Sequence, residues 1–386
     1  MSDLTVLALN SGSSTLKYGA YRVDAVQAER LLGGNVEFDD DDEAPHQRTQ
    51  TLQGIADLIA AGRMPAPDVI GHRVVHGGPT LRQHCVIDEA VLATLATAAP
   101  LAPLHTALAL SVIRLAQACF PHTPQVACFD TSFHAAMPDV ACVLPLPKVL
   151  RQEGIQRYGF HGLSAASIVR QLGPPPPARL LIAHLGNGVS ITAVRDGVSI
   201  DTSMGFTPTG GVLMGTRSGD LDPGVLLHLL RHHHYDTAML AELVDHRAGL
   251  LGLSGISSDM RSLHAAATAH PEADLAIRVF CYAVRKQIGA MAAALDGADT
   301  LVFTGGIGEH DWRVRADICG GLDSLGIELD AVRNRSVDQL ISGEASRVRV
   351  LVLPAQEEAQ IALQSALVVK SASPAPAPLI AGGTER

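Results

Sequence analysis

The chain has 386 residues, of which 47% are hydrophobic and 18% are charged, and its formal net charge is −10 at pH 7. This length predicts two domains of about 150–200 residues, each with its own core. The 29 Lys and Arg residues are scattered along the chain, which excludes the basic face that nucleic-acid binding requires. An anionic small-molecule substrate would need a local cluster of basic side chains.

The cysteines and the N-terminus indicate the compartment. The six cysteines form no CxxC pair, and most lie in apolar runs such as Val126–Phe129, which favours buried free thiols over metal ligands or disulfides. The chain enters the strand-like run Leu4–Leu9 without a basic region or cleavage site, so no signal peptide is expected. No apolar stretch is long enough to span a bilayer. These features predict a cytoplasmic protein without a membrane partner.

The first third of the chain is expected to open with three strands, at Leu4–Leu9, at Leu16–Val23 and up to Val36. The acidic run Asp39–Glu43 that follows is predicted to be a solvated loop, because like charges repel one another. Apolar spacing then predicts helices over 52–61, 89–98 and 104–120, strands over 68–75 and 125–129, and an irregular crossing over 138–147.

The buried strand Arg179–Ala183 begins a second copy of the opening pattern. Leu7–Gly12 and Leu181–Gly186 each join an apolar strand to a glycine-bearing polar turn, and another strand follows each turn. Two copies of this unit predict a duplicated α/β domain with a ligand between the copies. The rest of the chain is expected to form helices over 223–232, 239–245 and 273–295, strands over 300–303 and 348–353, and a mobile tail from residue 371.

Three glycine-bearing turns, Asn10–Ser14, His184–Gly188 and Thr304–Glu309, each follow an apolar strand. Glycine lets the main chain approach a ligand closely, so the N–H groups of such turns can converge on phosphate oxygens. Each turn alone is more often a plain tight turn, but three together favour a nucleotide. The absence of GxxxxGK[ST] and GxGxxG disfavours a P-loop or a dinucleotide fold. Lys17, beyond the first turn, either faces the phosphates or is an exposed strand residue.

Charged residues beside glycines or strand ends are candidates for the chemistry. Arg73, His161 and Arg217 lie in glycine-bearing segments and are suited to bind a carboxylate and a transferring phosphoryl group, although His161 alone also fits a structural histidine. Asp130 and Glu357 follow apolar strands, and Mg²⁺ prefers one or two carboxylates with water and phosphate oxygens. Asp130 alternatively fits the cap of the following helix.

Ten short motifs together resemble the acetate kinases, within the acetate and sugar kinase, Hsp70 and actin superfamily. They occur in the family's order over nearly the whole chain: NxGSSxxK, GHRVVHGG, PLH, FDTxFH, YGFHG, HLGNG, MGTRSGD, SSDxR, GIGE and EE. The resemblance implies an α/β fold of duplicated actin-like (ribonuclease H-like) domains, with the active site in the cleft between them. Residues 1–130 and 358–386 would form the N-terminal domain, and residues 131–357 the second, which would carry most of the ATP site.

The resemblance also implies reversible in-line transfer of the ATP γ-phosphoryl group to acetate, giving acetyl phosphate and ADP, by a homodimer. Asn10 and Glu357 would hold Mg²⁺ or Mn²⁺. The catalytic residues would be Asp130, His161, Arg217 and His105, and the acetate site would comprise Arg73, Val75, Leu104 and Pro208. ATP would contact Lys17, His184, Leu185, Gly186, Asn187, Gly188, Asp259, Met260, Arg261, Gly306, Ile307, Gly308, Glu309 and His310.

Physical chemistry narrows the role of Asp130. A substrate carboxylate has a pKa near that of Glu, about 4.3, and is already ionised at neutral pH, so no general base is needed. Asp130 is therefore expected to organise Mg²⁺ or water. Catalysis would depend on alignment of the reactants and on offsetting the charge of the transition state.

The chain departs from the family pattern at Thr106, Thr209–Gly210, Ala165 and His310, which leaves propionate or butyrate kinase and the nucleotide preference open. The resemblance implies that a smaller residue in place of Val75 would admit propionate, with one methylene worth about 1–3 kcal/mol. An ATPase switch of the actin or Hsp70 kind is disfavoured because it needs no basic substrate cluster. The run His232–His234 is predicted to be a solvated helix end and not a metal site.

Overall fold

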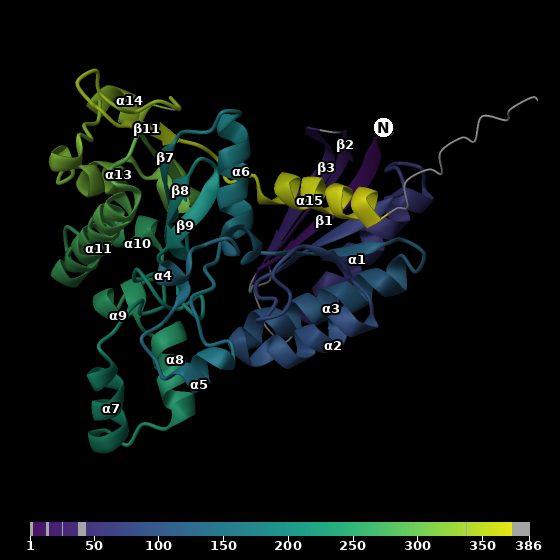
Figure 1. Ribbon diagram of the computed structural model, residues 1–386, viewed down its shortest axis with the longest axis horizontal. Coiled ribbons are helices and arrows are strands. Elements are labelled where there is room, and N and C mark those ends of the chain that lie inside the picture. Colours follow the sequence, from purple (N-terminus) through teal and green to yellow (C-terminus); the bar gives the residue numbers. More distant parts are fainter. Residues whose placement is uncertain (1–2, 13–14, 25, 38–43, 337, 373–386) are drawn as a thin grey trace, which may run out of the picture.

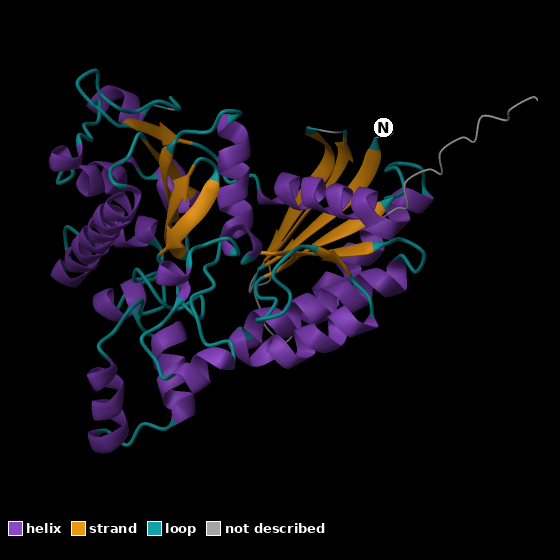
Figure 2. Cartoon of the chain, in the orientation of Figure 1, coloured by secondary structure: helices purple, strands orange, loops and turns teal. Residues whose placement is uncertain are grey.

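The computed structural model describes residues 3–12, 15–24, 26–37, 44–336 and 338–372. The acidic run Asp39–Glu43 therefore lies outside the described residues, and so does the tail beyond residue 372. The described strands form two separate mixed sheets, and helices cover both faces of each (Figures 1 and 2).

The first sheet has the strand order β3-β2-β1-β4-β6-β5 and the second has the order β11-β10-β7-β8-β9. The strands of the first sheet are β1 (Leu4–Ser11), β2 (Thr15–Val23), β3 (Ala28–Glu37), β4 (Val69–Val74), β5 (Cys85–Val86) and β6 (Gln125–Phe129). Those of the second are β7 (Arg179–Leu185), β8 (Val189–Arg195), β9 (Val198–Thr202), β10 (Thr300–Thr304) and β11 (Arg349–Val352).

The two sheets repeat one topology. In the first, β1 pairs antiparallel with β2 and parallel with β4, and β4 pairs parallel with β6. In the second, β7 pairs antiparallel with β8 and parallel with β10, and β10 pairs parallel with β11. The predicted duplication is thus confirmed, with β1 and β7 as equivalent strands.

The helices connect and cover these strands (Figure 1). They are α1 (Ala44–Ala60), α2 (Glu89–Ala98), α3 (Pro103–Cys119), α4 (Asp139–Cys142), α5 (Lys148–Gln152), α6 (Gly162–Leu172), α7 (Pro223–His232), α8 (Thr237–His246), α9 (Gly249–Ser254), α10 (Met260–Ala266), α11 (Pro271–Leu295), α12 (Gly305–His310), α13 (Trp312–Cys319), α14 (Ala331–Arg335) and α15 (Glu357–Ala372).

Strand alternation explains how each sheet is covered on both faces. In β1, Val6 and Ala8 pack in a core cluster with residues of α15, whereas Leu7 and Leu9 pack with residues of α1 and α3. Full burial of one such aliphatic side chain stabilises the fold by about 1.5–3 kcal/mol. The last described helix, α15, drawn in yellow in Figure 1, therefore covers the sheet formed by the first strands.

Helix α6 packs against both halves of the molecule. Its Leu163 belongs to the core cluster between the first sheet and α15, whereas Ala165 and Ile168 belong to a cluster with strands of the second sheet. Arg170 donates hydrogen bonds to Gln360 of α15 at 3.1 Å and to Gln356 at 2.7 Å. The helix that begins after His161 is thus held by both sheets.

Several elements differ from the sequence-based expectation. The crossing over 138–147 contains the short helix α4, and the turn expected over 304–309 is the helix α12. Strand β9 and the short helices α9, α10, α13 and α14 were not predicted, because segments of five to eight residues carry too little periodic pattern. The predicted free thiols are confirmed, with Cys85 and Cys119 half-buried and the other four buried.

Among the described residues, no helix is both long enough and apolar enough to cross a membrane.

His134 gives the fold a predictable sensitivity to acid. It is buried, its Nδ1 lies 2.8 Å from Ser199 Oγ, and its Nε2 lies 3.0 Å from the Phe160 carbonyl oxygen. Burial lowers the pKa of His134 from 6.5 to about 4. The unfolded chain therefore binds the proton first, and the stabilisation present above pH 6.5 is lost as the pH falls through about 4.

We expect His134→Gln to flatten the pH dependence of unfolding over this range by about 3 kcal/mol. The free energy of unfolding from urea titrations at several pH values between 4 and 8 measures the slope. Exposed His122, changed to Gln, is the matched control and should leave the slope unchanged. An unchanged slope for the His134 variant would contradict the prediction.

Candidate active site

Two equivalent hairpins approach the site, one from each sheet. In the first, Asn10 of β1 is the register partner of Lys17 of β2. Asn10 Nδ2 donates hydrogen bonds of 2.9 Å to both Glu357 Oε2 and Glu358 Oε1. Asn10 thus meets two glutamates that lie 347 and 348 positions further along the chain, because α15 begins at the end of β1. Lys17 is exposed, and the pKa of His184, which burial lowers most, is lowered further by Arg73 and Lys17.

Arg73, on β4, and Asp130, directly after β6, form a buried ion pair. Arg73 Nε and Nη2 lie 2.9 and 2.6 Å from Asp130 Oδ2, and the aspartate side chain is 1% exposed. Burial raises the pKa of Asp130, and Arg73 opposes this rise. Burial alone would also raise the pKa of Glu357, but Arg73, His184 and Asn10 lower it below its ordinary value. One guanidinium thus offsets two neighbouring carboxylates.

His161 and His184 stack at the junction between the sheets. Their ring centroids are 4.2 Å apart, His161 Nδ1 lies 3.0 Å from Ser190 Oγ, and His184 Nδ1 lies 2.8 Å from Ser164 Oγ. Burial, with help from His184, lowers the pKa of His161 well below 6.5, and burial also lowers that of His184. Both rings are therefore neutral at pH 7.

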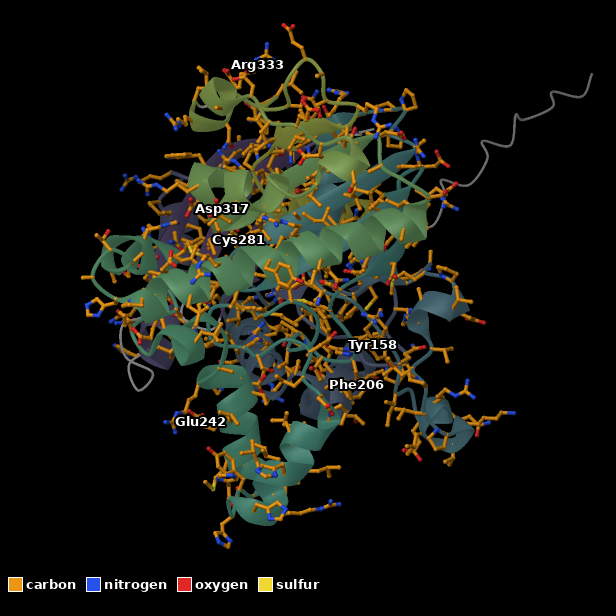
Figure 3. All side chains as sticks on the ribbon, turned by 90° about the vertical axis from the view of Figure 1, so that its left-hand side faces the viewer. Tyr158, Phe206, Glu242, Cys281, Asp317 and Arg333 are labelled. Carbon is orange, nitrogen blue, oxygen red and sulfur yellow. The ribbon has the colours of Figure 1, made fainter. Side chains whose placement is uncertain are left out.

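The backbone of His161 is strained. Its φ of 58° is left-handed, a conformation that costs a residue other than glycine about 1 kcal/mol or more. The preceding segment is fixed by aromatic packing, with Tyr158 4.5 Å from His76 and 6.2 Å from Phe206 between ring centroids (Figure 3). Such strain is common where a side chain must point into a functional site.

Arg217 and His105 join the two halves across the site. Arg217 Nη2 lies 3.1 Å from His105 Nε2, and Arg217 Nη1 donates to the Pro208 carbonyl at 3.4 Å. Because a guanidinium only donates, His105 Nε2 must accept. Burial, then Arg217 and Arg73, lower the pKa of His105 to about 3, so this ring is neutral as well.

A cavity of about 980 Å³ opens beside the second hairpin, which is formed by β7 and β8. Its volume is within the size range of small-molecule sites. Its lining includes eight of the fourteen residues predicted to bind ATP: Gly186, Asn187, Asp259, Met260, Arg261, Gly306, Ile307 and His310. The other six, Lys17, His184, Leu185, Gly188, Gly308 and Glu309, do not line it. The Leu185 side chain is buried in the core of the second half.

At two glycines an added side chain would meet close neighbours. A Cβ on Gly188 would lie 3.0 Å from His161 Nε2 and 3.8 Å from Arg217 Nη1. A Cβ on Gly305, whose φ is +78°, would lie 2.8 Å from the Leu185 carbonyl oxygen. The turn from Gly186 to Gly188 therefore has the cavity beside its first residue and the His161 and Arg217 side chains beside its last.

Glu309 has a structural partner set. Its Oε1 accepts hydrogen bonds of 3.0 Å from the backbone N–H groups of Gly305 and Ala355. The carboxylate thus ties α12, beside the cavity, to the segment that leads into Glu357. Glu309 therefore links two segments of the site, and its contact with ATP stays a prediction.

The oxygen donors beside the ion pair fit a hard divalent cation. Glu357 is ionised, Asn10 is its hydrogen-bond partner, and Asp130 Oδ1 is buried with no hydrogen-bond partner among the described residues. Within the described part of the chain, no three His, Cys, Asp or Glu side chains group as metal ligands. His232 and His233 instead pack against His228, with ring centroids 4.9 and 5.2 Å apart.

The predicted acetate pocket is described in part. Val75 is 5% exposed and belongs to a core cluster with Ala102, Tyr158 and Phe160. Pro208 is buried and contacts Arg217 through its carbonyl. The side chain of Leu104 lies outside the described residues, although its backbone belongs to α3.

The cavity also has lining residues that the sequence analysis missed, namely Ser258, His264, Ala265, Asp311, Trp312 and Arg313. His264 Nε2 lies 2.9 Å from Asp311 Oδ2, and the guanidinium groups of Arg313 and Arg335 lie 5.2 and 4.5 Å from the Trp312 ring. Trp312 is the only tryptophan in the chain and follows the third glycine-rich segment by three residues. Its place just after a predicted phosphate-binding turn was the one sequence feature that could have indicated a cavity-lining residue.

The chain is similar to known kinases over nearly its whole length. The model of the Acetokinase family matches residues 5–363. An acetate kinase of Methylocella silvestris is 40% identical over 389 residues, covering 92% of this chain and 96% of that protein. Crystal structures of a propionate kinase from Francisella tularensis and of an acetate kinase from Porphyromonas gingivalis give TM-scores of 0.83 and 0.80 at 32% and 33% identity, each covering 95% of this chain and 100% of theirs. The chain belongs to the acetokinase family.

Proposed function

We propose that the protein is an acetate kinase that transfers the γ-phosphoryl group of ATP to acetate and releases acetyl phosphate and ADP, in a reversible reaction. One observation carries the proposal. The glycine turn that lines the nucleotide-sized cavity ends at Gly188, against the side chains of His161 and Arg217. The Arg217 guanidinium and the neutral His161 ring therefore lie beside the position to which the terminal phosphate of a bound nucleotide would extend.

The residues act mainly by position and charge. Arg217 and Arg73 supply planar guanidinium donors for the carboxylate and for the oxygens of the transferring phosphoryl group. His161 is neutral, and its Nδ1 lies beside Ser190 Oγ. Its ring therefore offers a fixed hydrogen-bonding group to the reactants without adding charge. Aligned donors that offset developing charge lower the barrier of an in-line displacement.

Asp130 is better suited to organise charge than to take a proton. Acetate is already ionised at neutral pH, and Asp130 Oδ2 is bonded to Arg73. Asn10, Glu357 and Asp130 would hold Mg²⁺, which when bound offsets the negative charge of the phosphate oxygens. Glu309 would keep the segment before Glu357 in place relative to α12.

The test is ATP-dependent formation of acyl phosphate, trapped as the hydroxamate, with kcat/KM compared for acetate, propionate and butyrate. We expect acetate to react best. Propionate kinase is the second candidate, since the similar Francisella tularensis structure carries that name. ATP hydrolysis without acyl phosphate from any of the three acids would overturn the proposal and favour a nucleotide switch.

Substitution of Val75 should change acid selectivity. Val75→Ala removes two methyl groups from a buried wall, so we expect the ratio of propionate to acetate kcat/KM to rise about 10-fold or more. The hydroxamate assay with both acids measures the ratio. Val86→Ala, at a partly exposed valine of β5, is the control and should leave the ratio unchanged. A ratio unchanged in Val75→Ala would contradict a substrate role for Val75.

The proposal extends to domain organisation and assembly. We propose that residues 1–130 and 358–386 form one domain and 131–357 the other, supported by the packing of α15 on β1 and β4. We also propose a cytoplasmic homodimer, supported by unpaired thiols and by the exposed apolar residues Val225, Leu227 and Leu230 of α7. Light scattering after size-exclusion chromatography should give twice the mass of one chain, and the mass of a monomer would contradict the dimer.

A further inference from the structure

Asp245 lies in the last turn of α8, next to the loop that carries Arg217. Its side chain accepts a hydrogen bond from Thr209 Oγ1, and its backbone carbonyl accepts one from Thr216 Oγ1 at 2.8 Å. One residue of α8 therefore contacts both the residue before Arg217 and the residue after Pro208.

Backbone hydrogen bonds reinforce this connection. Ser218 N donates to the Val244 carbonyl at 2.9 Å, and Ala248 N donates to the Thr216 carbonyl at 2.9 Å. The residues on both sides of Arg217 are thus attached to the C-terminal end of α8. Arg217 in turn donates to the Pro208 carbonyl at 3.4 Å, which joins the two loops directly.

The charge of Asp245 is not explained by the stability of its helix. The C-terminal end of a helix carries partial negative charge and disfavours a carboxylate there. Arg217, by contrast, is half-buried, and the cation Arg73 is nearby. Burial chiefly, and Arg73 as well, lower the pKa of Arg217 and so disfavour its charged form. Asp245 opposes them by favouring the charged guanidinium.

We infer that Asp245 is a positioning residue for Arg217: its carboxylate holds the Pro208 and Arg217 loops together through Thr209 and offsets the charge of the guanidinium. The inference deepens the proposed function and rests on it. Asp245 does not act on the substrate itself, so its effect must pass through Arg217. The Thr209 hydroxyl supplies the donor for this link.

Asp245→Asn is the first variant to measure, because it keeps an oxygen acceptor for Thr209 and removes the charge. We expect kcat for acyl phosphate formation to fall about 10-fold to 100-fold, as for a small displacement of an aligned catalytic group. The KM for ATP should change by less than about twofold, since Asp245 does not line the nucleotide cavity. The melting temperature should be unchanged.

Thr209→Val separates the hydrogen bond from the charge. It removes the hydroxyl while keeping the shape of the side chain, so we expect the KM for acetate to rise about 3-fold to 10-fold with a smaller change in kcat. Glu242→Gln is the matched control, because Glu242 is an exposed carboxylate on the same helix (Figure 3). That variant should match the wild type in all these quantities.

A double-mutant cycle decides whether Asp245 acts through Arg217. In an Arg217→Ala background, Asp245→Asn should have no further effect on kcat. Additive losses, or a wild-type kcat in the single Asp245→Asn variant, would overturn the inference while leaving the proposed function intact. Absence of acyl phosphate formation by the wild-type protein would overturn both.

Discussion

Replacing Arg73 with Ala is expected to reduce kcat/KM for acetate about 1,000-fold and to destabilise the fold as well. The guanidinium lies within 3 Å of Asp130 through two nitrogens, and the Asp130 side chain is 1% exposed. Its removal leaves a buried carboxylate without a partner, which costs about 3–5 kcal/mol. The hydroxamate assay measures the activity, and urea titration measures the free energy of unfolding.

Two further variants separate these effects. Arg73→Ala combined with Asp130→Asn removes the unpaired charge, so stability should partly recover while activity stays low. Arg278→Ala removes an exposed pair with Asp274 and should cost less than about 1 kcal/mol without loss of activity. Near-normal acetate turnover in Arg73→Ala would contradict the substrate-binding role of Arg73.

The fold was predictable where pattern is strong and local. The antiparallel strands β1 and β2 follow from apolar alternation around a polar turn, and the second copy at β7 and β8 follows from the same layout. α12 was not predictable in this way. Three of its six residues are glycine, which has low helix propensity.

Tertiary contacts explain why α12 forms nevertheless. Arg315 is buried and donates hydrogen bonds of 2.9 Å to the carbonyl oxygens of Gly308 and Glu309, at the end of the helix. Glu309 in turn accepts from the N–H of Gly305. These hydrogen bonds join polar side chains to backbone groups, which hydrophobic periodicity does not register, so the glycine-rich segment was predicted to be a turn.

The same limit applies to the site. Motifs identified Asn10, Glu357, His105 and Arg217 one by one, but not how they pair. Asn10 meets Glu357 across 347 positions, and His105 meets Arg217 across 112. Such pairs depend on how the two sheets and α15 are arranged, which no single motif contains. The Arg73–Asp130 pair is a third example, at a separation of 57 positions.

Arg217→Ala should lower kcat about 100-fold to 1,000-fold while nucleotide binding is retained. Arg217 lies outside the lining of the cavity and contacts His105 and Pro208 instead. Trp312 lines the cavity and is the only tryptophan, so a nucleotide titration followed by its fluorescence reports binding without turnover. The dissociation constant for ATP should remain within about twofold of the wild-type value.

Arg247→Ala is the control for this experiment, because Arg247 is an exposed arginine directly after α8 and should be dispensable. Loss of ATP binding in Arg217→Ala would contradict a role confined to the phosphoryl group and the acetate. Without the guanidinium, His105 loses a cation that lowers its pKa, but burial, the larger cause, persists. The ring therefore stays neutral at pH 7 and cannot replace the missing charge, so lowering the pH to 6 should not restore kcat.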